Sequence, residues 1–175
     1  MKKCIKLLLI VCAFGVLMSG CGKNEKEEAT ALTIYEQLEI KKESLSDTET
    51  EAIQKGVNDW VKSFLAVNSN TRGKEKTNKG LYQSISNKEQ QSKLKEEREA
   101  FYKDSVVVIE DVSTQITDSK KAKYNDKEVG VVDCKTTVKG TRNNEAFEQT
   151  YTMQMVVNYQ TDVVSVYEVN SITWK

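Results

Sequence analysis

The sequence contains no histidine among its 175 residues, and this absence excludes several kinds of active site. Histidine is the commonest general base and metal ligand, so Ser-His-Asp and Cys-His catalysis, HExxH zinc hydrolysis and histidine-ligated haem are ruled out. The charge is balanced, with 26 basic and 26 acidic side chains, which gives no global positive field for nucleic acid. The length fits one domain of about 100–200 residues with a short leader or tether.

The start of the chain, residues 1–20, has the features of a signal peptide. Three lysines and no acidic residue precede an unbroken apolar stretch from Leu7 to Met18. At about twelve residues this stretch is too short to span a bilayer, which needs about 20. It fits the apolar core of a secretory leader.

The end of this leader resembles the lipobox of bacterial lipoproteins. Leu17-Met18-Ser19-Gly20-Cys21 places two small residues before a cysteine, with Met18 where that family prefers leucine. The resemblance implies cleavage between Gly20 and Cys21 and a diacylglyceryl group on the Cys21 thiol. Acyl chains contribute about 0.8 kcal/mol per buried CH₂, so we expect a lipid-anchored protein on the extracytoplasmic face of the cell membrane. The alternative is an ordinary secretory leader followed by an unmodified cysteine.

Loss of the leader simplifies the cysteine content. Cys4 and Cys12 leave with the leader and Cys21 carries lipid, so Cys134 is the remaining thiol and no internal disulfide forms. Cys134 lies in an apolar strand pattern, which favours a buried inert thiol over a nucleophile. Because the sequence also has no EF-hand loop and no P-loop, we expect no metal and no cofactor.

Composition divides the mature chain into a tether and one domain. The charged run over residues 22–28 has nothing to bury and predicts a solvated tether. Irregular apolar positions from Ala29 to Leu45 indicate a weak helix. We therefore expect a lipid anchor and tether over 21–45 and a single folded domain over 46–175.

Two strong helices are expected in the first half of this domain. Three S/T-x-x-E capping boxes mark helix starts: Ser46 with Glu49, Thr48 with Glu51, and Ser86 with Glu89. In the first helix the apolar residues recur at spacings of three and four and share one face: Ile53, Val57, Trp60, Val61, Phe64 and Leu65. The second helix is mostly charged and runs to about Lys103.

After Asp104 the apolar period changes to two, which indicates strands. Turn residues separate four strands, at 125–126, 140–144 and 161–162. The predicted inward residues are Val106, Val108, Val112 and Ile116, then Val132, Cys134, Thr136 and Val138, then Phe147, Tyr151, Met153, Met155, Val157 and Tyr159. The fourth strand, Val163 to Trp174, slips in phase near Asn170 and Ser171. Connections this short make an antiparallel meander.

The predicted strands are long, about 12–16 residues where about 5–6 is usual, so the sheet must coil or bulge. The result is an α+β fold with N-terminal helices packed on a strongly curved four-stranded antiparallel meander. Over about residues 46–175 this order of elements resembles the nuclear transport factor two-like (cystatin-like cone) superfamily. In this arrangement the helix over 53–65 fills the concave face of the cone.

Two carboxylates are candidate catalytic residues. Glu110 is in phase with Val112 and Glu168 with Val166, so regular strands would point both side chains into the cone. A carboxylate in an apolar cavity has a raised pKa and can shuttle protons, and some enzymes of the cone superfamily use this chemistry. The alternative is that bulges rotate both residues outward, or that they lie past the rim of the helix.

Two surfaces are candidates for binding. Asp133, Lys135, Thr137 and Lys139 alternate with the inward residues of the second strand and form either a docking face or a plain solvent face. Residues 70–105 carry nine basic and six acidic side chains, so this helical side either faces anionic lipid or is simply solvated. It has no aromatic platform among its lysines, so we expect no nucleic-acid partner.

These features favour a membrane-anchored lipoprotein without enzymatic activity, whose domain binds another envelope protein or a ligand. The resemblance to cone domains implies one concrete form, a scaffold component of a conjugation or type IV secretion machine. The alternative is an enzyme or small-molecule binder of the cone superfamily that uses Glu110 or Glu168.

Overall fold

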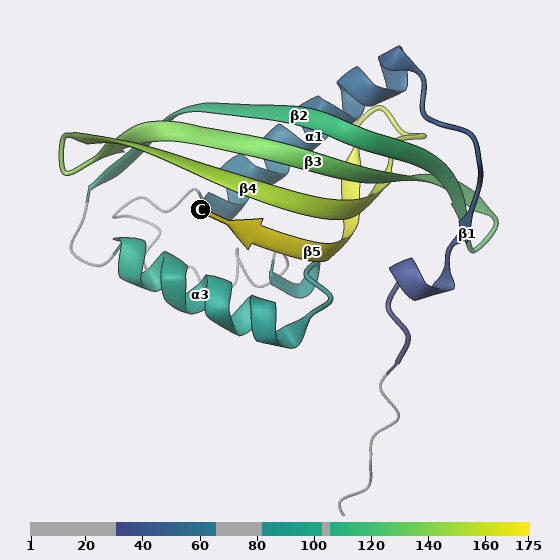
Figure 1. The fold of residues 1–175 in the computed structure, drawn as a ribbon, viewed down its shortest axis with the longest axis horizontal. Helices are drawn as coiled ribbons and strands as arrows, with labels where there is room; N and C mark the ends of the chain where they lie inside the picture. The colour runs from purple at the N-terminus through teal and green to yellow at the C-terminus, as the bar shows by residue number, and fades with distance from the viewer. Residues whose placement is uncertain (1–30, 66–81, 103–105) are drawn as a thin grey trace, which may run out of the picture. The chain divides into compact units, whose positions relative to one another are not determined.

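A computed structural model of the chain describes residues 31–65, 82–102 and 106–175 (Figure 1). The elements are η1 (Tyr35–Gln37), β1 (Glu39–Ile40), α1 (Asp47–Leu65), α3 (Lys88–Tyr102), β2 (Val107–Tyr124), β3 (Lys127–Arg142), β4 (Glu145–Asn158) and β5 (Ser165–Trp174). The strands form one antiparallel sheet in the order β1-β2-β3-β4-β5. The fold is α+β, and the sheet is curled into a half-barrel with cone-like curvature.

Helix α1 begins where its capping box predicts. The backbone N–H of Ser46 donates to Glu49 Oε2 at 2.7 Å and its hydroxyl donates to the same oxygen at 2.9 Å. The Glu49 N–H donates in return to Ser46 Oγ at 3.3 Å. These bonds satisfy donors that have no partner inside the helix. Thr48 lies inside the helix, so the box predicted for Thr48 and Glu51 does not mark its start.

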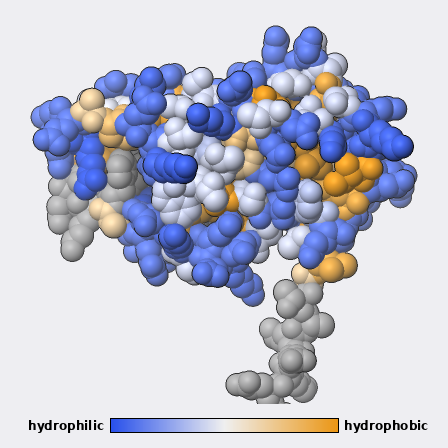
Figure 2. Space-filling model, in the orientation of Figure 1, coloured by the Kyte–Doolittle hydropathy of each residue, from blue (hydrophilic) through white to orange (hydrophobic). Residues whose placement is uncertain are grey.

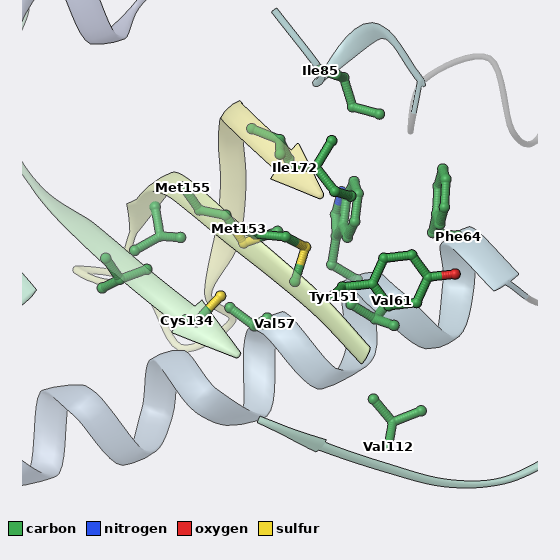
Figure 3. Packing of buried hydrophobic residues seen from close by; sticks show 14 of the residues in the cluster. Val57, Val61, Phe64, Ile85, Val112, Cys134, Tyr151, Met153, Met155 and Ile172 are labelled. Carbon is green, nitrogen blue, oxygen red and sulfur yellow. The ribbon is translucent and has the colours of Figure 1, made fainter. Parts of the chain in front are cut away.

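The core lies between α1 and the concave face of the sheet (Figure 3). All six residues predicted for the inner face of α1 are buried, as are the four predicted for β3. Strand β4 adds Tyr151, Met153, Met155 and Val157, while Phe147 and Tyr159 pack on the core with partial exposure. The apolar periods of 3.6 residues in the helix and two residues in the strands therefore identify the helix face and the sheet face that pack together.

Two tight turns join β2 to β3 and β3 to β4. Asn125 and Asp126 have φ values of 48° and 62°, and Asn143 and Asn144 have values of 51° and 67°. Asparagine and aspartate tolerate this left-handed conformation, and two such residues in succession match the twist of a β-hairpin. The turn positions predicted from these residues are confirmed.

Bulges bend the long strands, as their length predicts. In β5 the register shifts twice, leaving Tyr167 and Asn170 as extra residues opposite β4, the second of them at the predicted phase slip. In β2 the extra residues are Glu110 and Thr117. The prediction that Val106 and Val108 face the core is wrong. The bulge at Glu110 separates them from Val112, which is buried, and places both on the exposed side of the sheet. Each extra residue reverses the in-and-out alternation of the strand.

The segment before α1 differs from the predicted weak helix. It contains only the single 3-10 turn η1, followed by the two-residue strand β1, which pairs with Lys123 and Ala122 of β2. The sheet consequently has five strands where four were predicted. Residues 31–43, called the strap below, belong to the folded unit and not to the tether.

Helix α3 begins at Lys88, and its N-cap lies one residue after the predicted cap, Ser86. The side chain of Asn87 caps it, since Asn87 Oδ1 accepts a hydrogen bond from the Gln90 N–H at 2.9 Å. Ser86 bonds to strand β5 and does not cap the helix: its backbone N–H donates to the Val169 carbonyl at 3.1 Å. The Val169 N–H donates to the Ser84 carbonyl at 2.7 Å, so this segment covers part of the outer edge of β5.

Candidate functional site

The first predicted carboxylate, Glu110, lies at the surface. It is the extra residue of the bulge between Ile109 and Asp111, and its side chain is exposed. The bulge rotates it out of phase with Val112, which is the alternative that the sequence left open. Glu110 therefore does not enter the cone.

The second carboxylate, Glu168, is buried at 4 % exposure, but on the convex face of the sheet. It pairs with Val156, whose side chain belongs to the small cluster on that face, because the bulge at Tyr167 reverses the alternation. Its carboxylate accepts hydrogen bonds from the N–H groups of Ile34 at 2.5 Å and Tyr35 at 3.4 Å. Glu168 therefore holds the first turn of the strap and lies outside the cone.

The concave side of the sheet is filled by side chains. Trp60 and Phe64 stack with ring centroids 5.2 Å apart, and Tyr82 meets Phe64 edge-on. A cleft of about 50 Å³ remains beside Arg98 and Trp174, which is room for a few water molecules. Pockets for organic ligands are usually about 300–1,000 Å³.

Cys134 is buried in this core, as its strand pattern predicts. Burial raises the pKa of its thiol to about 12, so the thiol stays protonated at neutral pH. A thiol in this state is a poor nucleophile. Among the described residues no group of three cysteine, aspartate or glutamate side chains is placed to hold a metal ion.

The predicted docking residues lie together on the convex face of the sheet. Asp133 and Thr137 are partly exposed and Lys135 and Lys139 are exposed, with their neighbours Cys134, Thr136 and Val138 facing inward. Figure 1 shows α1 behind the strands in this view, and Figure 2 shows the face toward the viewer as mostly blue and white over β2, β3 and β4. The structure thus brings all four residues to one surface.

Polar contacts between side chains of neighbouring strands lie at both ends of this surface. Gln154 Nε2 donates to Asp133 Oδ1 at 2.9 Å, and Asn170 Nδ2 donates to Gln154 Oε1 at 2.6 Å, so one chain of hydrogen bonds crosses three strands. At the other end Lys139 forms an ion pair with Glu148 at 3.2 Å. These contacts reduce the side-chain freedom that binding would otherwise have to remove.

Two exposed valines border the same surface, although their strand pattern predicts that they face the core. Val106 is 71 % exposed and Val108 is 51 % exposed. Val108 pairs with Thr141, two residues from Lys139 on the same face of β3. Among the described residues, no strand pairs with the adjoining edge of β2 from Val107 to Lys120. We call this surface the open convex face: Val106, Val108, Asp133, Lys135, Thr137 and Lys139.

The opposite end of the convex side is covered by the strap. Ile34, Tyr35 and Leu38 pack on a small apolar cluster made by Ala122, Val129, Val131 and Val156. Polar strap residues that contact the sheet include Lys41, whose N–H donates to the Lys121 carbonyl at 2.8 Å. A signal for this cluster is present in the sequence, since Val129, Val131 and Val156 are apolar at positions that alternate away from the core.

An ion cluster joins the strap, α1 and the sheet. Glu128 bonds Lys41 Nζ at 2.8 Å and the Tyr159 hydroxyl at 2.7 Å, while Lys121 Nζ contacts Glu49 at 3.0 Å and Glu128 at 3.7 Å. The bonds from Lys41 and Tyr159 lower the pKa of Glu128 to about 2. Burial, reinforced by the bond to Glu128, raises the pKa of Tyr159 to about 12. Both groups therefore keep one protonation state near neutral pH.

The predicted lipid site, Cys21 with Gly20 before it, lies outside the described residues, as do the leader and the charged tether. The same holds for five of the nine basic residues predicted to face lipid, Arg72, Lys74, Lys76, Lys79 and Lys103. On α3, Lys88, Lys93 and Lys95 are exposed and interspersed with exposed glutamates, whereas Arg98 is buried.

Comparison of the chain with protein-family models, curated proteins and solved structures found no match. Within the described residues, neither helix has the length and apolar character needed to cross a bilayer.

Proposed function

We propose that the protein is an extracytoplasmic lipoprotein, held at the cell membrane by acyl chains on Cys21, whose domain docks a protein of the cell envelope. The observation that supports docking is the open convex face. It combines two exposed valines with four polar residues, of which Asp133 and Lys139 make cross-strand contacts. Protein interfaces commonly have this composition, with an apolar anchor beside polar groups that set orientation.

The rival function, an enzyme or small-molecule binder of the cone superfamily, receives no support from its two candidate residues. Glu110 is exposed, and the carboxylate of Glu168 is engaged by two backbone N–H groups of the strap. A group that shuttles protons must reach its substrate. Neither position meets this requirement within the cone.

A concrete form of the proposal is a scaffold component of a conjugation or type IV secretion machine. The support is the pattern of two helices followed by a curled antiparallel sheet, which is the basis of the resemblance to the cone superfamily. Genes for a transfer ATPase or a relaxase beside the gene for this chain would favour this form. A neighbourhood without transfer genes would count against it.

The docking part is tested by site-specific photo-cross-linking in living cells. A benzophenone amino acid at Thr137, on the open convex face, is expected to capture one envelope protein, and the same probe at the exposed Glu99 of α3 serves as the matched control. Adding Lys135→Glu should reduce the Thr137 product severalfold by reversing a charge within the interface. Recovery of the monomer alone, or of the same products from both positions, would reject the open convex face as the docking surface.

The lipid anchor is tested separately at Cys21. We expect Cys21→Ala and Cys21→Ser to abolish incorporation of labelled fatty acid and to leave the leader uncleaved, because the thiol is the acceptor of the diacylglyceryl group. Normal processing of either variant to a membrane-bound product would contradict the lipoprotein assignment.

A further inference from the structure

The strap is fixed firmly to one end of the sheet. Glu168 binds the N–H groups of Ile34 and Tyr35, and the Lys121 N–H donates to the Glu43 carbonyl at 2.8 Å. Beneath the strap lies the small apolar cluster of the convex side. The outer surface of the strap therefore has a defined position on the domain.

That outer surface carries two large aliphatic side chains. Leu32 is 65 % exposed and Ile40 is 45 % exposed, on either side of η1. Figure 2 shows an orange area at this end of the molecule, beside β1. Two partly buried tyrosines, Tyr35 of the strap and Tyr124 of β2, pack on the small cluster beneath it, and tyrosine is enriched at membrane–water interfaces.

The polar residues of η1 direct their hydrogen bonds back to the strap. Glu36 Oε2 accepts from the N–H of Thr33 at 2.8 Å and from its hydroxyl at 3.0 Å. Gln37 Nε2 donates to the carbonyls of Leu32 and Thr33, both at 2.9 Å. These groups already have partners within the protein, which reduces the cost of removing them from water.

Chain length places this surface beside the bilayer if Cys21 carries lipid. Only residues 22–30 separate Cys21 from the strap, and nine residues span at most about 32 Å when extended and about 17 Å as a flexible coil. The other end of β2 is far away, because fifteen residues separate Ala122 from Val107, a length of about 50 Å along a strand. The strap end is therefore the end that meets the membrane.

The strap itself provides no basic cluster for such a contact. The strap holds Glu36, Glu39 and Glu43 against Lys41 and Lys42, so it has no excess of positive charge. Attraction to anionic lipid would need a basic cluster. Contact through the strap must instead come from burial of apolar side chains, which is insensitive to salt.

We propose that the strap is a membrane-contact surface, with Leu32 and Ile40 inserted at the headgroup level of the phospholipid bilayer. This inference rests on the proposed lipid anchor at Cys21. It fixes the orientation of the domain, with the strap end on the membrane and the end of the open convex face that carries Val106 and Val108 projecting away from it.

The experiment uses the full lipidated protein in phosphatidylcholine vesicles, with an NBD fluorophore on one introduced cysteine at a time. The test positions are Leu32→Cys and Ile40→Cys, and the matched controls are Val106→Cys at the far end of β2 and Lys95→Cys on α3. The native Cys134 is buried and protonated, so it does not compete for the label. Doxyl-labelled lipid is expected to reduce emission at least twofold at positions 32 and 40 and to leave position 106 unchanged, at low salt and at 0.5 M salt alike.

The outcomes separate this inference from the proposal on which it depends. Protein that does not float with the vesicles overturns both the lipid anchor and the strap contact. Protein that floats while positions 32 and 40 behave like position 106 overturns the strap contact alone. Quenching at position 95 in place of positions 32 and 40, seen only when phosphatidylglycerol is added to the vesicles and lost in 0.5 M salt, would instead assign membrane contact to α3 and would overturn the contact through the strap.

Discussion

Adjacent residues of β3 experience opposite environments on the two faces of the sheet. Cys134 is fully buried against α1, whereas Lys135 is exposed on the convex side. On the concave face the main apolar cluster buries β3 from Val132 to Val138. The convex face is divided, with the strap over one end and a polar surface with two valines at the other. Burial therefore determines stability on one face and leaves part of the other exposed.

The largest expected difference between the two faces is in thiol reactivity. At pH 8 a thiol with a pKa of about 12 is ionised about a thousandfold less than an ordinary cysteine, and Cys134 is buried as well. We expect Lys135→Cys to add one thiol that reacts with an aromatic disulfide at the ordinary rate, while Cys134 stays unlabelled until urea unfolds the protein. Equal labelling rates in the folded state would show that the concave face is open to water.

A cavity on the concave face should cost much more stability than a change on the convex face. Met155→Ala, at a fully buried position of β4, is expected to lower the free energy of unfolding by about 2–5 kcal/mol. Thr152→Val, at an exposed position of the same strand that faces the convex side, should change it by less than about 0.5 kcal/mol. Urea unfolding measures both, and similar losses would remove the distinction between the faces.

Glu168, which follows the bulge residue Tyr167, and Glu110, itself a bulge residue, should differ in what their removal costs. Glu168→Ala leaves two N–H groups of the strap without their acceptor and should destabilise the protein by about 1–3 kcal/mol. Glu110→Ala removes an exposed side chain and should cost less than about 0.5 kcal/mol. Hydrogen exchange at Ile34 and Tyr35 should accelerate in the first variant only. Unchanged protection there would show that Glu168 does not hold the strap.

The smallest effect is expected in the ion cluster, where the Glu128 side chain is 31 % exposed and partly screened. The folded pKa of Glu128, about 2, lies below its ordinary value of 4.5, so its contribution to stability is complete above pH 4.5 and is lost as pH falls toward 2. Glu128→Gln should therefore flatten the pH dependence of unfolding in this interval. The control Glu145→Gln, at the exposed first residue of β4, should leave the wild-type slope unchanged; an identical slope in both variants would refute the role of Glu128.

The elements of the concave face could be predicted because their signals are local. The spacing from Ile53 to Leu65 identifies the inner face of α1, and asparagine or aspartate at positions that need positive φ identifies the hairpins. The outward position of Asp133 and Lys135 could be predicted for the same reason. Strict alternation in β3, which contains no extra residue, makes each residue's face predictable from its neighbours.

The positions of Glu110, Glu168, Val106 and Val108 could not be predicted in this way. Each lies at or beyond a bulge, and one extra residue exchanges the two faces of the strand that follows. The strap was missed for a related reason, because β1 has only two residues and depends on a partner that is more than 80 residues away in the chain. Short elements of this kind have no period of their own to detect.

Local sequence is enough to specify the helical and strand periods, the hairpin turns, the buried state of Cys134 and the signal that points to lipid at Cys21. These features depend on residues close together in the chain, where side-chain type and spacing fix the outcome. Contacts between distant segments establish that Glu168 holds the strap, that Val106 and Val108 face solvent, and that the convex side is divided between a covered end and an open one. Those features depend on register between distant strands, and register is set by the packing of the whole sheet against α1.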